Sequence, residues 1–130
     1  MNRVAITGLG LVCALGNNVE ECWKTLTAGE SRIRPLRDGG SPPYKFQTGA
    51  EARDFNPAAH FTEKELVLLE RFAQLAAVAA REAVTQSGLT FSGDLADESA
   101  VITGSSVGGQ FSERKATSGS IARRIHAWHR

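Results

Sequence analysis

The sequence has only two cysteines and one methionine among 130 residues, and it contains no long hydrophobic run. Two cysteines cannot build the disulfide framework of a small secreted domain, and no secretory segment follows Met1. No apolar stretch approaches the roughly 18 residues that a membrane-spanning helix needs. These absences predict a cytoplasmic protein without a membrane span.

The sequence also lacks a large excess of charge of either sign. Its formal net charge is +1 at pH 7, with 42% hydrophobic and 22% charged residues, which is an ordinary globular composition. Binding to nucleic acid would require a clustered basic face. We therefore expect one globular unit and no nucleic-acid partner.

The charge is unevenly distributed along the chain. Residues 1–110 carry a formal charge of −3, whereas residues 111–130 carry +4 and two of the three histidines. An Arg-, Ser-, Ala- and His-rich run is typical of coding sequence read out of phase, so we interpret 111–130 as a basic tail from a frameshifted or truncated reading frame. The alternative is an amphipathic tail that binds a partner through Ile121, Ile125 and Trp128.

Two short apolar runs end in glycines. Val4–Ile6 leads to Gly8, and 100–102 leads to Gly104. Such runs are typical of buried strands, and we predict that the two are neighbours in one covered sheet. Glycine after each run allows the backbone to turn or to pass close to another segment.

Capping signals predict two helices. Asn18 and Glu21 open the first helix, which should end near Gly29. Its expected apolar face consists of Val19, Cys22, Trp23 and Leu26. Residues 31–57 are rich in Gly, Pro and Arg and are predicted to be an irregular excursion, with a short strand around residues 45–48.

The second predicted helix is long. Thr62 and Glu65 form a capping box, and the helix can run to Ser87 with Gly88 at its C-terminal end. Alanines through its middle should let it lie close against a neighbouring element; they are Ala73, Ala76, Ala77, Ala79, Ala80 and Ala83. Its polar residues should face polar surroundings or pair with one another. The elements together predict an α/β fold.

Several separated segments resemble one family. They are R-V-A-I-T-G-L-G-L-V-C-A-L-G-N-N-V-E-E-C-W, then D-F-N with the helix L-E-R-F-A-Q-L-A and A-R-E-A up to Gly88, and finally A-V-I-T-G-S-S-V-G-G. In this order and spacing they are similar to the N-terminal part of the β-ketoacyl synthases, over residues 3 to about 110. We therefore divide the chain into 1–110, an incomplete synthase region, and the tail 111–130.

The resemblance implies part of a thiolase-like fold, a five-layered α-β-α-β-α arrangement of two similar halves. It also implies decarboxylative Claisen condensation of acyl groups on acyl carrier protein in fatty acid biosynthesis, by an enzyme that is a homodimer at full length. The alternatives are a non-catalytic remnant or interaction module that pairs with full-length synthases, and a piece of a polyketide ketosynthase.

No catalytic residue is assigned in this chain. The family uses a nucleophilic cysteine and two histidines that lie beyond the matched region. Cys13, Cys22 and His60 do not correspond to them, and His126 and His129 fall in the tail. We therefore expect no condensing activity from these 130 residues alone.

Two positions carry an expected role through the resemblance. Val107 matches a branched apolar residue at the acyl-binding tunnel, although it could equally fill the core. Lys64 matches a basic contact for acyl carrier protein. Apolar residues replace the basic residues that often follow it, and the cluster Arg32, Arg34 and Arg37, together with Arg71, could compensate.

No cofactor or metal site is predicted. The turn G-L-G-L-V-C lacks the third glycine of a dinucleotide fingerprint, and G-S-S-V-G-G-Q-F lacks the lysine of a phosphate loop. His60 has no ligand companions at metal-binding spacing. Because only part of a larger fold is expected, apolar faces should remain uncovered, which predicts poor solubility or molten behaviour.

Overall fold

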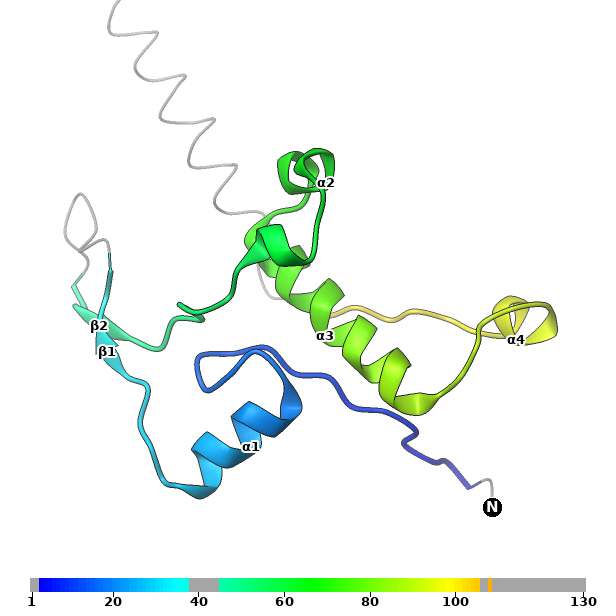
Figure 1. Cartoon of the computed structure of the whole chain (residues 1–130), viewed down its shortest axis with the longest axis horizontal. Helices are drawn as coiled ribbons and strands as arrows, with labels where there is room; N and C mark the ends of the chain where they lie inside the picture. The colour runs from blue at the N-terminus through cyan, green and yellow to red at the C-terminus, as the bar shows by residue number, and fades with distance from the viewer. Residues whose placement is uncertain (1–2, 38–44, 106–107, 109–130) are drawn as a thin grey trace, which may run out of the picture.

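The computed structural model describes residues 3–37, 45–105 and 108. Helix α3 (Arg71–Ser87) is the longest element, and the N-terminal segment and the other helices are arranged around it (Figure 1). In chain order the remaining elements are α1 (Val19–Thr27), β1 (Arg34–Pro35), β2 (Thr48–Gly49), a 3-10 turn (Pro57–Ala59), α2 (Glu63–Leu68) and α4 (Asp94–Asp97). The described chain is therefore a mixed helix and strand structure dominated by helices.

The predicted cap of α1 is confirmed. The Asn18 side chain accepts a hydrogen bond from the Glu21 amide at 2.8 Å, and the helix ends just before Gly29, whose φ is +68°. The expected apolar face is only half covered, however. Cys22 is buried, whereas Trp23 and Leu26 are 65% and 58% exposed, because the described residues provide no element to cover that side.

The long helix predicted from Thr62 to Ser87 is wrong in one respect, because it is interrupted. Its capping box forms at Thr62 and Glu65, but α2 ends at Leu68, and Leu69 and Glu70 are extended, with ψ of 119° and 162°. The buried amide of Gln74 donates to the freed Leu69 carbonyl at 2.8 Å. This side-chain hydrogen bond and the packing of Leu69 against the buried core together override local helix propensity here.

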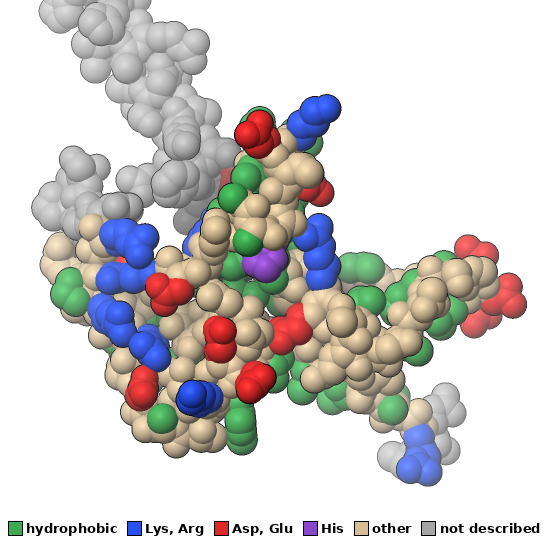
Figure 2. Space-filling view, in the orientation of Figure 1, with side chains coloured by type: hydrophobic (Ala, Val, Ile, Leu, Met, Phe, Trp, Pro, Cys, Tyr) green, Lys and Arg blue, Asp and Glu red, His purple; other side chains and the backbone are tan. Residues whose placement is uncertain are grey.

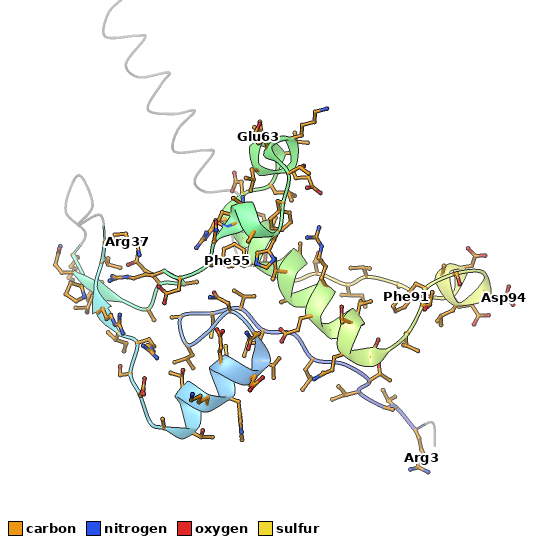
Figure 3. The ribbon with its side chains drawn as sticks, viewed as in Figure 1. Arg3, Arg37, Phe55, Glu63, Phe91 and Asp94 are labelled. Atoms are coloured by element: carbon orange, nitrogen blue, oxygen red, sulfur yellow. The ribbon has the colours of Figure 1, made fainter. Side chains whose placement is uncertain are left out.

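The small core lies on one side of this interruption. Phe55, Phe61 and Val78 are buried together, and half-buried apolar residues pack against them: Val12, Ala52, Leu66, Leu69, Leu75 and Ala77. The Arg71 guanidinium lies 4.6 Å from the centre of the Phe55 ring and donates to the Ala52 carbonyl at 2.7 Å. Figure 3 shows Phe55 beside the N-terminal half of α3. The interruption lets Leu66, Leu69 and Leu75 all reach this one core.

The predicted strands at both glycine runs are not formed. The sheet in the described residues consists of β1 and β2, antiparallel, with Arg34 opposite Gly49 and Pro35 opposite Thr48. The two apolar runs lie in irregular backbone and are exposed: Val4 94%, Ile6 83%, Val101 92% and Ile102 95%. A buried strand needs hydrogen-bonding neighbours and cover on both faces, and no described segment supplies them.

The short strand predicted around residues 45–48 forms at Thr48–Gly49, within the irregular excursion. Arg53 ties this region together by donating to the Glu51 carboxylate at 2.7 Å and to the Pro35 carbonyl. Among the helices that the structure describes, none is long and apolar enough to cross a membrane.

Candidate functional site

The N-terminal glycine segment docks directly on α3. Gly8 lies over the Ala83 carbonyl, and Gly10 lies over the Ala79 carbonyl. A Cβ on either glycine would sit far inside 3.0 Å of that carbonyl oxygen, a spacing that folded proteins do not tolerate. The expectations that these glycines allow close approach and that the alanine-rich helix admits a close neighbour are both confirmed here.

Two polar side chains of α3 hold the backbone of this segment. Gln86 accepts from the Leu9 amide at 2.6 Å, and the Glu82 carboxylate accepts from the amides of Leu11 and Val19, both at 2.9 Å. The sequence reasoning missed this role. The sequence does contain a signal for it, namely two hydrogen-bond acceptors four positions apart on one helix face. Their spacing along the helix is close to the spacing of amides two residues apart on an extended chain.

Glu82→Ala is expected to release the segment locally. The substitution leaves the Leu11 and Val19 amides without their acceptor, at a cost of roughly 1–2 kcal/mol. Hydrogen exchange at those two amides should accelerate about tenfold. Glu20→Ala, at an exposed glutamate of α1, is the control and should leave both rates unchanged; unchanged rates in Glu82→Ala would contradict the assignment.

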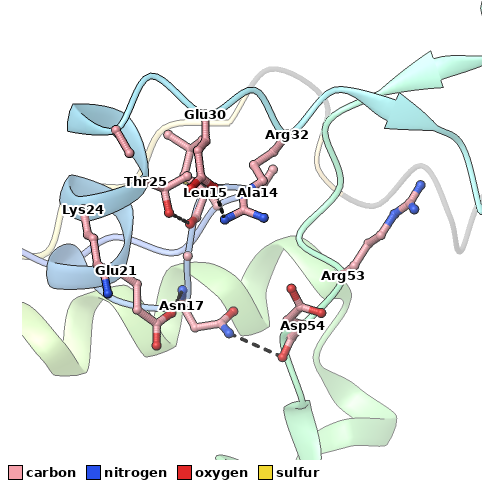
Figure 4. Close-up of a pocket in the computed structure, with 13 residues that line it drawn as sticks. Ala14, Leu15, Asn17, Glu21, Lys24, Thr25, Glu30, Arg32, Arg53 and Asp54 are labelled. Atoms are coloured by element: carbon pink, nitrogen blue, oxygen red, sulfur yellow. Dashed lines mark hydrogen bonds and ion pairs between the residues drawn. The ribbon is translucent and has the colours of Figure 1, made fainter.

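A pocket of about 520 Å³ opens beside the loop that follows the docked segment. Its wall combines residues 13–17, one side of α1 and side chains from the excursion (Figure 4). Thr25 donates to the Leu15 carbonyl at 2.9 Å, and Arg32 pairs with Glu30 at 2.9 Å. The pocket is open and carries charges of both signs, so it has no built-in preference for an anion or a cation.

Cys13 lines this pocket, and Cys22 is buried behind it. The Sγ atoms of Cys13 and Cys22 are 3.6 Å apart, and the Cys22 thiol donates to the Gly16 carbonyl at 3.3 Å. Burial, together with the neighbouring Cys13 thiol, raises the pKa of Cys22 to about 11. Cys22 therefore stays protonated at neutral pH and lacks the activation of a catalytic nucleophile.

Of the two site residues carried by the resemblance, the structure describes Lys64. Lys64 is exposed on α2, between Glu63 and Glu65, with the exposed apolar side chains of Val67 and Leu68 on the next turn. The Thr62 amide and hydroxyl donate to the Glu65 carboxylate and lower its pKa. Val107 lies outside the described residues, as does the tail 111–130.

Basic side chains gather around β1 and β2, away from Lys64 (Figure 2). Figure 2 shows Lys and Arg over the part that carries β1 and β2, where Arg34 and Arg37 are exposed. Arg53 and Arg32 in the same region are partly neutralised by Glu51 and Glu30. The positive charge of Arg34 and Arg37 therefore lies apart from Lys64 on α2.

The described ranges hold no group of three or more potential metal ligands. His60 stacks on Phe55, with ring centroids 5.5 Å apart, and its carbonyl accepts from Arg81 at 2.9 Å. These contacts give His60 a place in the packing around the core.

The docked glycine segment, the alanine helix beneath it and the second glycine run belong to a condensing-enzyme domain. The model of the family "Beta-ketoacyl synthase, N-terminal domain" matches residues 1–128, and the chain is a member of that family. The resemblance stated from the sequence is thereby confirmed.

Curated relatives agree with this membership. The chain is 39% identical over 107 residues to the 3-oxoacyl-[acyl-carrier-protein] synthase 2 of Coxiella burnetii, covering 82% of this chain and 26% of the relative. It is 36% identical to the enzyme of the same name from Staphylococcus aureus, with the same coverage. The chain thus spans about a quarter of the length of the curated relatives it matches. The boundary at residue 110 and the frameshifted origin of the tail stay predictions.

Proposed function

We propose that this chain is the N-terminal part of a 3-oxoacyl-[acyl-carrier-protein] synthase, an acyltransferase of fatty acid biosynthesis that performs decarboxylative Claisen condensation. The family membership and the names of the relatives support this reading. The observation that carries it is the Gly8 and Gly10 segment packed on Ala83 and Ala79, because both halves of that contact lie within the residues that the family model matches. These relatives do not favour the two alternatives, a piece of a polyketide ketosynthase and a non-catalytic remnant or interaction module.

Within that enzyme, the chain supplies scaffold and not bond-making groups. We propose that the chain forms one portion of a five-layered thiolase-like fold. In the whole enzyme, the runs at Val4 and Val101 become covered strands. Val107 would contribute an apolar wall to the acyl tunnel. We further propose that the full-length enzyme is a cytoplasmic homodimer whose acyl and malonyl substrates arrive on acyl carrier protein.

A hybrid enzyme tests this proposal. In the Coxiella burnetii synthase, the matching N-terminal segment is replaced by residues 3–110 of this chain, and ketoacyl product is assayed with acyl and malonyl carrier thioesters. The hybrid should condense, and the 130-residue protein alone should not. An inactive but folded hybrid, or ketoacyl product from the 130-residue protein, would each overturn the assignment.

Lys64→Glu in the hybrid is expected to weaken binding of the carrier protein. The side chain is exposed and the carrier is acidic, so reversing its charge should raise KM for the acyl carrier substrate about fivefold at low salt, with kcat little changed. The effect should fade at high salt. Lys45→Glu, at the far end near β2, is the matched control, and an equal rise in KM there would refute a specific role for Lys64.

A further inference from the structure

Cys13, which lines the pocket, and the buried Cys22 form a pair of thiols whose chemistry the synthase reaction does not use. Cys13 and Cys22 are nine positions apart in sequence, and the loop between them returns on itself through reciprocal backbone hydrogen bonds of Cys13 and Gly16. Their Sγ atoms are 3.6 Å apart. A disulfide needs about 2.05 Å, so a shift of roughly 1.5 Å would join them.

The surroundings of the two sulfurs differ. Cys13 lines the 520 Å³ pocket and is half-buried, so a small oxidant can reach its sulfur. Cys22 is 2% exposed and is held on the buried side of α1 by its hydrogen bond to Gly16. The accessible sulfur therefore reacts first, and the buried sulfur is placed to react with the product.

We propose that Cys13 and Cys22 are a redox modification site, which a peroxide converts into an intramolecular disulfide. The Cys13 thiolate attacks one peroxide oxygen, so that an S–O bond forms and the O–O bond breaks. The departing hydroxide takes up the proton that the Cys13 thiol released on ionising, and it leaves as water. Cys13 is then a sulfenic acid.

In the second step, the Cys22 sulfur attacks the Cys13 sulfur. The S–S bond forms, the S–O bond breaks, and the leaving hydroxide takes the Cys22 proton to give a second water. Two thiols are oxidised by two electrons and one peroxide is reduced. Because burial raises the pKa of Cys22 to about 11, this second step should accelerate as the pH rises toward that value.

The product would fix the loop between the docked segment and α1. That loop forms one wall of the pocket, and Thr25 of α1 already holds it through the Leu15 carbonyl. A covalent bond between Cys13 and Cys22 keeps this wall in its present shape. Reduction by a dithiol restores the two thiols.

The test treats the 130-residue protein with hydrogen peroxide, blocks the remaining thiols with iodoacetamide and digests with a glutamate-specific protease. Cleavage after Glu20 and Glu21 separates the cysteines into different peptides. In the oxidised protein these peptides should remain joined and come apart with dithiothreitol. At micromolar protein the bond should form roughly a thousandfold faster within a chain than between chains.

Two serine variants distinguish the roles of the two sulfurs. Cys22→Ser should accumulate a sulfenic acid at Cys13 that dimedone traps, whereas Cys13→Ser should leave Cys22 largely unmodified. Peptides that separate without reductant, a sulfinic acid at Cys13 beside free Cys22, or a bond formed only between chains would overturn the proposal. The synthase assignment does not depend on any of these results.

Discussion

Alanine at position 10 is expected to undock the N-terminal segment from α3. The new Cβ would collide with the Ala79 carbonyl and approach the Ala83 amide, and helix backbone cannot move aside as a flexible side chain can. We expect Gly10→Ala to destabilise this contact by roughly 3 kcal/mol or more. In the hybrid enzyme the free energy of unfolding should fall by that amount, measured by urea denaturation, and condensing activity should be lost with it.

Gly104→Ala, compared with Gly10→Ala in the 130-residue protein, is the matched control for this prediction. A Cβ at Gly104 meets no atom within 4 Å, and its φ lies outside the left-handed region. Each glycine-to-alanine substitution lowers the conformational entropy of the unfolded chain, which stabilises the folded state by about 0.4–1 kcal/mol. Because this effect is the same in both variants, the difference between their free energies of unfolding reports the collision alone. Comparable stability of the two variants would show that Gly10 does not approach α3 this closely.

The 130-residue protein is expected to bind a dye specific for apolar surface, several-fold above a compact control domain. The core contains few residues, and no side chain in the described ranges is fully buried. Many large apolar side chains are exposed instead, including Val4, Ile6, Val101 and Ile102. Dye fluorescence and concentration-dependent association, followed by light scattering, measure the effect.

Substitutions at the exposed positions separate this effect from general unfolding. Ile6→Lys and Ile102→Lys should lower dye fluorescence and association while leaving the helical circular dichroism unchanged, because neither side chain packs in the core. Val78→Ala removes a core contact and should increase dye binding. A sharp cooperative thermal transition without dye binding would contradict the prediction.

The features that the sequence predicted correctly are those that local chemistry determines. The Asn18 cap, the Thr62–Glu65 capping box and the left-handed Gly88 each depend on residues within one helical turn. The close approach at Gly8 and Gly10 was also predictable, because missing side chains on one element pair with alanines on another.

The features that the sequence did not predict depend on distant residues. Val4–Ile6 has the composition of a buried strand, but strand pairing requires neighbours that composition cannot supply. The interruption at Leu69 follows from the packing of Leu69 against the core around Phe55, and no proline or glycine marks it. The cysteine pair was equally hidden, because its proximity depends on how the loop at Gly16 turns.

Glu82 holds both ends of the turn between the N-terminal segment and α1. Its two carboxylate oxygens hold Leu11 on one side of that turn and Val19 on the other. One side chain of α3 therefore holds residues 12–18 at both ends. A rotation of α3 about its axis that kept these two hydrogen bonds would shift the rim of the cavity at Cys13 and Asn17.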